Sequence, residues 1–269
     1  MALHPPDPGG IVGHEAVLEL LPRLTAPTLL FSGPEGVGRR PVARWYAWGL
    51  NRGFPPPACG EHPDLLELGP REGGLRGRAE VRLEEVEPLF AWLAVHPRER
   101  AKVAVLDAAH RLTEAAANAL LKLLEEPPSY ARLVLIAPSR DTLLPTLASR
   151  ALEVPFGPVP EARLRALTED PDLLAYAAGA PGRLLRALAD PALFRARLEK
   201  GKRALAAPLL ERLALLRELL AEEEGFALLH ALLRRRPRAL LALEAAREAL
   251  ERYVSPDLVL ARLALDLEA

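Results

Sequence analysis

Residues 28–48 read TLLFSGPEGVGRRPVARWYAW, and this stretch decides the fold. The short apolar run Thr28–Ser32 predicts a buried strand that ends in a glycine-rich turn. Pro41 suits the first position of a helix, so a helix is expected over Val42–Leu50. The glycines follow the spacing of a phosphate-binding loop, G-x4-G-K-[ST], at Gly33, Gly36 and Gly38.

The two residues that complete such a loop are both replaced here. In a working loop, a lysine reaches the phosphates and a serine or threonine hydroxyl holds Mg²⁺. Arg39 and Arg40 stand in these places. Arg39 keeps a positive charge on a bulkier, forked group, whereas Arg40 has no hydroxyl to offer a metal. The loop alone leaves two interpretations equally open: a site that still binds an anion, and a purely structural glycine turn.

The alternation of strand and helix signals continues to residue 156. Apolar runs predict four further strands, at Leu65–Leu68, Lys102–Leu106, Arg132–Ala137 and Ala151–Phe156. Helical periodicity predicts helices over Val81–Val95 and over Glu114–Glu126, the second capped by Thr113. Apolar strands that alternate with helices indicate an α/β fold with a parallel sheet covered on both faces.

After Phe156 the strand signals stop, and the rest of the chain is rich in Leu, Ala, Arg and Glu with helical periodicity. Breaks in that pattern fall near Pro208, Gly225, Pro237 and Pro256. We therefore predict three parts: an α/β domain over residues 1–157, a small helical domain over 158–194, and a helical C-terminal domain over 195–269.

A second motif, VLDAAHR, follows the strand Lys102–Leu106. An ATPase of this kind needs two acidic residues here, one to organise Mg²⁺ and the next to polarise water. Asp107 supplies the first, but Ala108 stands where the second belongs. Two separate nucleotide motifs have thus each lost the residue most directly tied to hydrolysis.

Three segments carry a resemblance to a known family: IVGHEAV (residues 11–17), LDAAHRLTEAAANALLKLLEEPP (106–128) and LLPTLASRALEVPF (143–156). They resemble the clamp-loader branch of the AAA+ ATPases. With both ATPase motifs damaged, the chain is most similar to the delta-prime family of the bacterial DNA polymerase III clamp loader. The resemblance implies an AAA+ parallel-sheet domain, a helical lid and a C-terminal helical collar.

The resemblance also implies a role for Ser149-Arg150-Ala151. Working clamp loaders carry Ser-Arg-Cys there, and the arginine points into a neighbouring subunit's ATP site; here Ala151 replaces the cysteine. An arginine supplied in this way stabilises charge that develops on the γ-phosphate. Arg183 is the corresponding candidate for a second sensor, and Pro138 or Ser139 falls at the polar sensor position. Without the resemblance, Arg150 would be interpreted as a surface residue or a local salt-bridge partner.

Cofactor expectations follow from the same comparison. The resembled family often has a four-cysteine zinc module, but only Cys59 and His62 occur in the matching region, so we expect no zinc. ATP and Mg²⁺ are expected on neighbouring subunits. One cysteine predicts no disulfide framework, and the lack of a long apolar run and of a signal-peptide pattern predicts a cytoplasmic protein. The formal net charge of −1 indicates no global attraction to nucleic acid. Abundant Arg and Pro without Gln are thermophile-like, although GC-rich coding would give the same bias.

Together with the two damaged ATPase motifs, the resemblance implies a clamp-loader subunit without intrinsic ATPase activity, a component of the DNA polymerase III holoenzyme. It would act as the stator of a ring and offer Arg150 to a neighbour during loading of the sliding clamp onto primed DNA. The implied partners are ATP-binding subunits of the gamma/tau type and the delta subunit, with clamp and DNA reached through the assembly and no membrane. Two alternatives stay open: an active ATPase with an atypical loop, and a pure scaffold.

Overall fold

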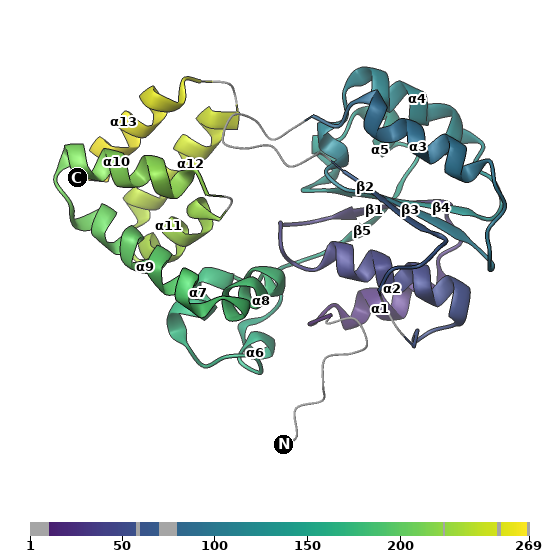
Figure 1. The fold of residues 1–269 in the computed structure, drawn as a ribbon, viewed down its shortest axis with the longest axis horizontal. Helices are drawn as coiled ribbons and strands as arrows, with labels where there is room; N and C mark the ends of the chain where they lie inside the picture. The colour runs from purple at the N-terminus through teal and green to yellow at the C-terminus, as the bar shows by residue number, and fades with distance from the viewer. Residues whose placement is uncertain (1–10, 58–59, 70–79, 223, 252–253, 268–269) are drawn as a thin grey trace. The chain divides into compact units, whose positions relative to one another are not determined.

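The computed structural model describes residues 11–57, 60–69, 80–222, 224–251 and 254–267. The chain divides into two compact units. One, called the α/β unit below, comprises residues 1–166 and 179–181; the other, the helical unit, comprises residues 167–178 and 182–269. Figure 1 shows a sheet with helices on both of its faces in the α/β unit, and stacked helices in the helical unit.

The described strands form one five-stranded sheet in the order β2-β3-β4-β1-β5, and every neighbouring pair is parallel. In chain order they are β1 (Thr28–Ser32), β2 (Leu65–Leu68), β3 (Lys102–Leu106), β4 (Ala131–Ala137) and β5 (Leu152–Pro155). All five predicted strands are confirmed, with bounds that differ by at most one residue at each end. Ser32 pairs with Ala137, so β1 and β4 end level at the carboxyl edge of the sheet.

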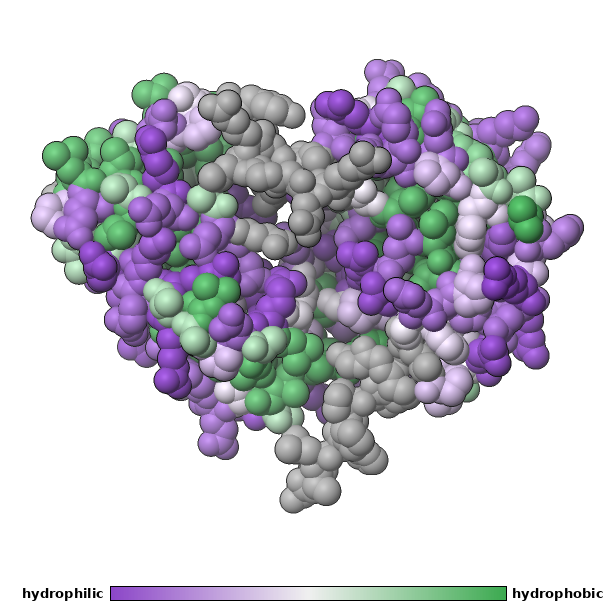
Figure 2. Space-filling view, viewed as in Figure 1, coloured by the Kyte–Doolittle hydropathy of each residue, from purple (hydrophilic) through white to green (hydrophobic). Residues whose placement is uncertain are grey.

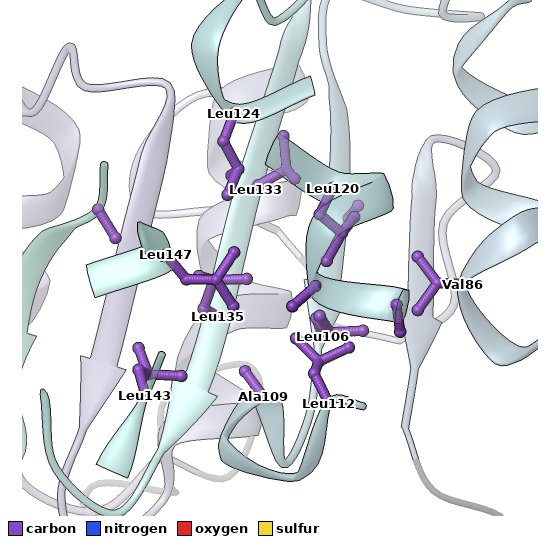
Figure 3. Packing of buried hydrophobic residues seen from close by; sticks show 14 of the residues in the cluster. Val86, Leu106, Ala109, Leu112, Leu120, Leu124, Leu133, Leu135, Leu143 and Leu147 are labelled. Carbon is purple, nitrogen blue, oxygen red and sulfur yellow. The ribbon is translucent and has the colours of Figure 1, made fainter. Parts of the chain in front are cut away.

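Two hydrophobic cores cover the two faces of this sheet. Leu29 and Phe31 point to one face and pack with α1 and α2, whereas Leu30 between them points to the other. On that second face Leu133 and Leu135 of β4 pack with α3, α4 and α5 (Figure 3). Successive side chains of a strand point to opposite faces, and both faces of this sheet are buried. This explains the unbroken apolar runs Leu29–Phe31 in β1 and Leu133–Ala137 in β4.

The helices of the α/β unit are α1 (Glu15–Leu20), α2 (Arg39–Arg52), α3 (Leu83–Leu93), α4 (Glu114–Glu125), α5 (Pro145–Ala148) and α6 (Glu161–Leu164). Short 3-10 turns occupy Leu21–Arg23, Ala109–Arg111 and Arg140–Thr142. Thr113 caps α4 as predicted, since its Oγ1 accepts a hydrogen bond from the backbone N–H of Ala116 at 3.3 Å.

Two helix starts differ from the prediction. Helix α2 begins at Arg39, directly after Gly38, so Pro41 is its third residue and not its first. Proline is tolerated there because the first N–H groups of a helix have no partner within it. Helix α3 begins at Leu83, because Val81 instead forms a parallel β-bridge with Leu112.

The helical unit contains, in the described residues, α7 (Pro171–Ala177), α8 (Pro181–Ala189), α9 (Pro191–Ala206), α10 (Leu209–Leu220), α11 (Gly225–Leu233), α12 (Pro237–Glu251) and α13 (Pro256–Asp266). The first residue of α8 lies in the segment assigned to the α/β unit. Helices start at or next to each break expected from the sequence. The chain packs as two units, and the finer division at residues 157/158 and 194/195 stays a prediction.

Candidate functional site

The glycine loop lies at the carboxyl end of β1, where parallel α/β sheets bind their ligands. Gly33 adopts φ 144° and donates its N–H to the carbonyl of Pro138 at 2.9 Å. A Cβ at this position would stand 2.1 Å from the backbone oxygen of Phe156. Gly36 and Gly38 also have positive φ, 79° and 113°. The turn therefore needs glycine for its own packing, whatever it binds.

Arg39, in the place of the phosphate-binding lysine, is turned toward the sheet. Its Nη1 donates a hydrogen bond to the carbonyl oxygen of Ala137 at the end of β4. Burial lowers the pKa of the Arg39 guanidinium, while Asp107 and Glu35 act in the opposite direction. The cation is thus engaged by the chain's own backbone.

Arg40 and Arg44 of α2 share one carboxylate, that of Glu67 in β2. Arg40 Nε donates to Glu67 Oε1 at 2.8 Å, and Arg44 Nη2 donates to Oε2 at 2.7 Å. Arg40 Nη1 also lies 4.0 Å from Oδ2 of Asp107. A guanidinium therefore stands beside the carboxylate that would organise Mg²⁺, and the hydrogen bond that Arg40 donates to Glu67 raises the pKa of Arg40.

This ion cluster predicts a pH-dependent contribution to stability. Burial alone would raise the pKa of Glu67, but hydrogen bonds from Arg44 and Arg40 outweigh it, so the pKa is lowered. A carboxyl group with a lowered folded-state pKa stabilises the fold above its ordinary pKa and loses that contribution as the pH falls through the lowered value. We expect Glu67→Gln to reduce the free energy of unfolding by about 1 kcal/mol at pH 7.

Urea unfolding followed by tryptophan fluorescence measures this difference between the wild type and Glu67→Gln. The difference should shrink as the pH falls below about 4, because the unfolded wild-type chain takes up a proton at Glu67 first and the folded chain does so only at its lowered pKa. An equal difference at pH 7 and pH 3 would contradict the proposed charge pairing.

The acidic motif does not supply a second carboxylate. Asp107 Oδ1 accepts a hydrogen bond from the N–H of Ala108 at 2.8 Å, and Ala108 adopts a left-handed conformation with φ 52°. The methyl group of Ala108 cannot polarise water. With Arg40 beside Asp107, these residues do not fit a magnesium–nucleotide complex.

Arg150 lies at the opposite end of the sheet. It stands two residues before β5, and its partner Glu125, the last residue of α4, stands six residues before β4. Both therefore lie at the amino ends of parallel strands, whereas the glycine loop lies at the carboxyl ends. The Arg150 side chain is 33% exposed. The structure does not bring Arg150 together with its own glycine loop.

The sensor candidates lie in different units. Pro138 and Ser139 follow β4 at the carboxyl edge of the sheet, and Ser139 immediately precedes the 3-10 turn Arg140–Thr142. Arg183 of α8 lies in the helical unit, where its Nη1 donates to the carbonyl oxygens of Tyr176 and Ala177 at 3.3 and 3.2 Å. Within that unit, Arg183 binds the carboxyl end of α7.

No cluster of three or more metal-ligating side chains occurs among the residues that the structure describes. Cys59 falls outside these residues. His62 is buried, accepts a hydrogen bond from the N–H of Asp64 at 3.0 Å, and packs edge-on against Trp48. In the same described part, no helix is long and apolar enough to cross a membrane.

Three contacts of these sites were missed by the sequence interpretation. Glu67 was treated as part of an apolar strand, although a charge within LLEL is itself a signal of a polar partner. Arg44 follows Arg40 by four residues and so lies on the same face of α2. Glu125 was included in a helix but was not linked to Arg150, which lies 25 residues further along the chain.

A five-stranded parallel sheet with a glycine turn, followed by a helical region, fits the α/β class of AAA+ domains. A DNA polymerase III gamma subunit-related protein from Thermotoga maritima has this fold, with a TM-score of 0.55 over 94% of this chain and 98% of that one, at 21% identity. The family model described as "DNA polymerase III, delta subunit" matches residues 23–160, just over half of the chain. The chain belongs to this family.

Curated relatives refine the assignment. The delta-prime subunit of DNA polymerase III from Pseudomonas aeruginosa is 33% identical over 181 residues, which cover 58% of this chain and 54% of that protein. The delta-prime subunit from Haemophilus influenzae is 41% identical over 90 residues, 33% of this chain and 26% of that protein. The gamma/tau subunit of Mycobacterium tuberculosis is 33% identical over 147 residues, 51% of this chain and 25% of that protein. The matches thus span a quarter to about half of these relatives.

Proposed function

We propose that this chain is a non-hydrolysing, delta-prime-type subunit of the replicative clamp loader, which supplies Arg150 to the ATP site of a neighbouring subunit. The observation that carries the proposal is the position of Arg150 on the edge of the sheet opposite the glycine loop. Any nucleotide that its exposed guanidinium meets must belong to another chain. Arginine suits this task because it is always charged and can bind phosphate oxygens bidentately.

The partners in this proposal are ATP-binding subunits of the gamma/tau type, the delta subunit, the sliding clamp and primed DNA, all in the cytoplasm. ATP and Mg²⁺ are held by the neighbours, and this chain holds neither nucleotide nor zinc. Arg40 Nη1 lies 4.0 Å from Oδ2 of Asp107, the carboxylate that would organise Mg²⁺. This cation beside the acidic residue supports the absence of ATP hydrolysis by the chain itself. Residues 158–194 would form the lid and residues 195–269 the collar.

The surface of the helical unit supports the collar role. Leu210 of α10 is 82% exposed, and Leu258 and Leu265 of α13 are 68% and 51% exposed. Leu258 and Leu265 are seven residues apart and so share one face of their helix. Figure 2 shows hydrophobic residues gathered where α10 and α13 lie, at the upper left. Exposed apolar surface of this kind is typical of a protein contact.

The purified chain alone is expected to show no ATP turnover above a no-protein blank. Arg40 has no hydroxyl for Mg²⁺ and Ala108 no carboxylate for water, so a hydrolytic site cannot assemble. Release of phosphate from ATP and Mg²⁺ measures this directly. Turnover that disappears in Arg39→Ala would instead support the alternative of an active ATPase with an atypical loop.

The role in the assembly is tested by rebuilding the clamp loader with Arg150→Ala and measuring DNA-stimulated ATP hydrolysis. A lower rate supports the arginine finger. An unchanged rate would favour the pure scaffold.

A further inference from the structure

Three hydrogen bonds hold the guanidinium of Arg150. Nη1 donates to the carbonyl oxygen of Thr146 at 2.9 Å and to Oγ of Ser149 at 3.3 Å, and Nη2 donates to Oε1 of Glu125 at 2.5 Å. Thr146 lies in α5 and Ser149 directly follows that helix, so both acceptors belong to the same short segment as Arg150. Glu125 comes from α4, so it is the contact that ties the side chain to another element of the fold.

The contacts leave part of the guanidinium available. Arginine has five N–H donors, and the bonds within the described part of the chain use three of them, two on Nη1 and one on Nη2. The N–H of Nε and the second N–H of Nη2 remain. Two donors on adjacent nitrogens form the fork that binds two phosphate oxygens.

The position of Glu125 is unfavourable for the helix that carries it. It is the last residue of α4, where the helix dipole disfavours a negative charge. Its side chain is 51% exposed, and an ion pair this exposed adds little to the stability of the fold. The carboxylate of Glu125 therefore neither favours the helix nor adds much to the stability of the fold. Its contact with Arg150 gives it a role, because that contact orients the guanidinium.

We infer that Glu125 is a positioning residue for the arginine finger: it holds one side of the guanidinium so that the remaining two donors face a phosphate on the neighbouring subunit. This inference rests on the proposed function. In this role Glu125 does not contact the nucleotide. It restricts the Arg150 side chain before the phosphate binds, so that less conformational entropy is lost on binding.

The test is DNA-stimulated ATP hydrolysis by the assembly rebuilt with Glu125→Ala. We expect kcat to fall by about tenfold with an unchanged KM for ATP, because the neighbour still binds the nucleotide and only the finger is misoriented. Glu125→Gln keeps an oxygen acceptor and should recover part of the rate. Glu126→Ala is the matched control, since it removes the adjacent exposed carboxylate and leaves the three bonds of Arg150 intact.

A double-mutant comparison shows whether Glu125 acts through Arg150. If it does, adding Glu125→Ala to Arg150→Ala causes no further loss. Suppose that the Arg150→Ala assembly is slow, so that the arginine finger is supported. The inference about Glu125 would then be overturned by equal losses of rate in Glu125→Ala and Glu126→Ala, or by a faster rate in Glu125→Ala. An Arg150→Ala assembly with the wild-type rate would overturn both the proposed function and this inference. Unchanged thermal unfolding of the Glu125→Ala chain excludes a folding defect.

Discussion

Replacing Arg150 with alanine is expected to slow ATP hydrolysis at the neighbouring subunit's site by about 10³-fold, the lower end of the effect of arginines supplied in trans. The reaction builds negative charge on the γ-phosphate oxygens, and a guanidinium beside them stabilises that charge more than it stabilises bound ATP. The loss should therefore appear in kcat. An assembly in which the other ATP sites are disabled by mutation isolates the site that faces this chain.

Two variants separate a finger from a general change in surface charge. Arg165→Ala removes an exposed arginine of the same α/β unit that pairs with Glu161 at 2.7 Å, and it should leave the rate unchanged. Arg150→Lys keeps the charge but loses the fork, so its rate should lie between those of wild type and Arg150→Ala. Equal rates for Arg150→Ala and Arg165→Ala would mean that Arg150 does not reach the phosphate.

The elements that sequence patterns predicted best are those whose signal is local. Strands β3 and β4 contain the apolar runs Val103–Leu106 and Leu133–Ala137 because both of their faces are covered, and these runs mark the strands from composition alone. The cap at Thr113 depends on a residue three positions away. In each case the physical cause lies within a few residues of its effect.

The charge pairings could not be predicted because their partners are distant in the sequence. Glu67 lies 27 residues from Arg40, and the two meet only after α2 has packed against the sheet. Sequence reasoning correctly found that Arg40 lacks a metal-binding hydroxyl, but the pairing with Glu67 depends on the three-dimensional packing. The same holds for Glu125 and Arg150, which the order of the strands brings to one edge of the sheet.

The glycine turn has a structural task that is independent of nucleotides. Gly33 directly follows β1, next to the ends of the two neighbouring strands. On the β4 side, its N–H donates a hydrogen bond to the carbonyl of Pro138. On the β5 side, the N–H of Phe156 donates to the carbonyl of Ser32 at 2.7 Å. These contacts join three strands at one point. They explain why a glycine is needed at residue 33 even where Arg40 and Ala108 provide no hydrolytic chemistry.

Gly33→Ala is therefore expected to reduce the free energy of unfolding of the α/β unit by about 3 kcal/mol or more. Part of this cost is the backbone conformation at φ 144°, about 1–3 kcal/mol for a residue with a side chain. The rest is steric, because the new Cβ would stand 2.1 Å from the backbone oxygen of Phe156, and forced repacking costs about 1–3 kcal/mol. The strands must separate to admit the methyl group.

Gly53→Ala separates these two causes. Gly53, which follows α2, has φ 92° and ψ 161°, yet a Cβ there would meet nothing within 4 Å, so only the backbone cost of about 1–3 kcal/mol remains. Urea unfolding followed by tryptophan fluorescence suits both variants, since Trp45, Trp48 and Trp92 all lie in the α/β unit. Gly33→Ala could instead reduce the free energy of unfolding by no more than Gly53→Ala does. The close approach to Phe156 would then not be what requires glycine at residue 33, and nucleotide or anion binding by the loop would be the better explanation.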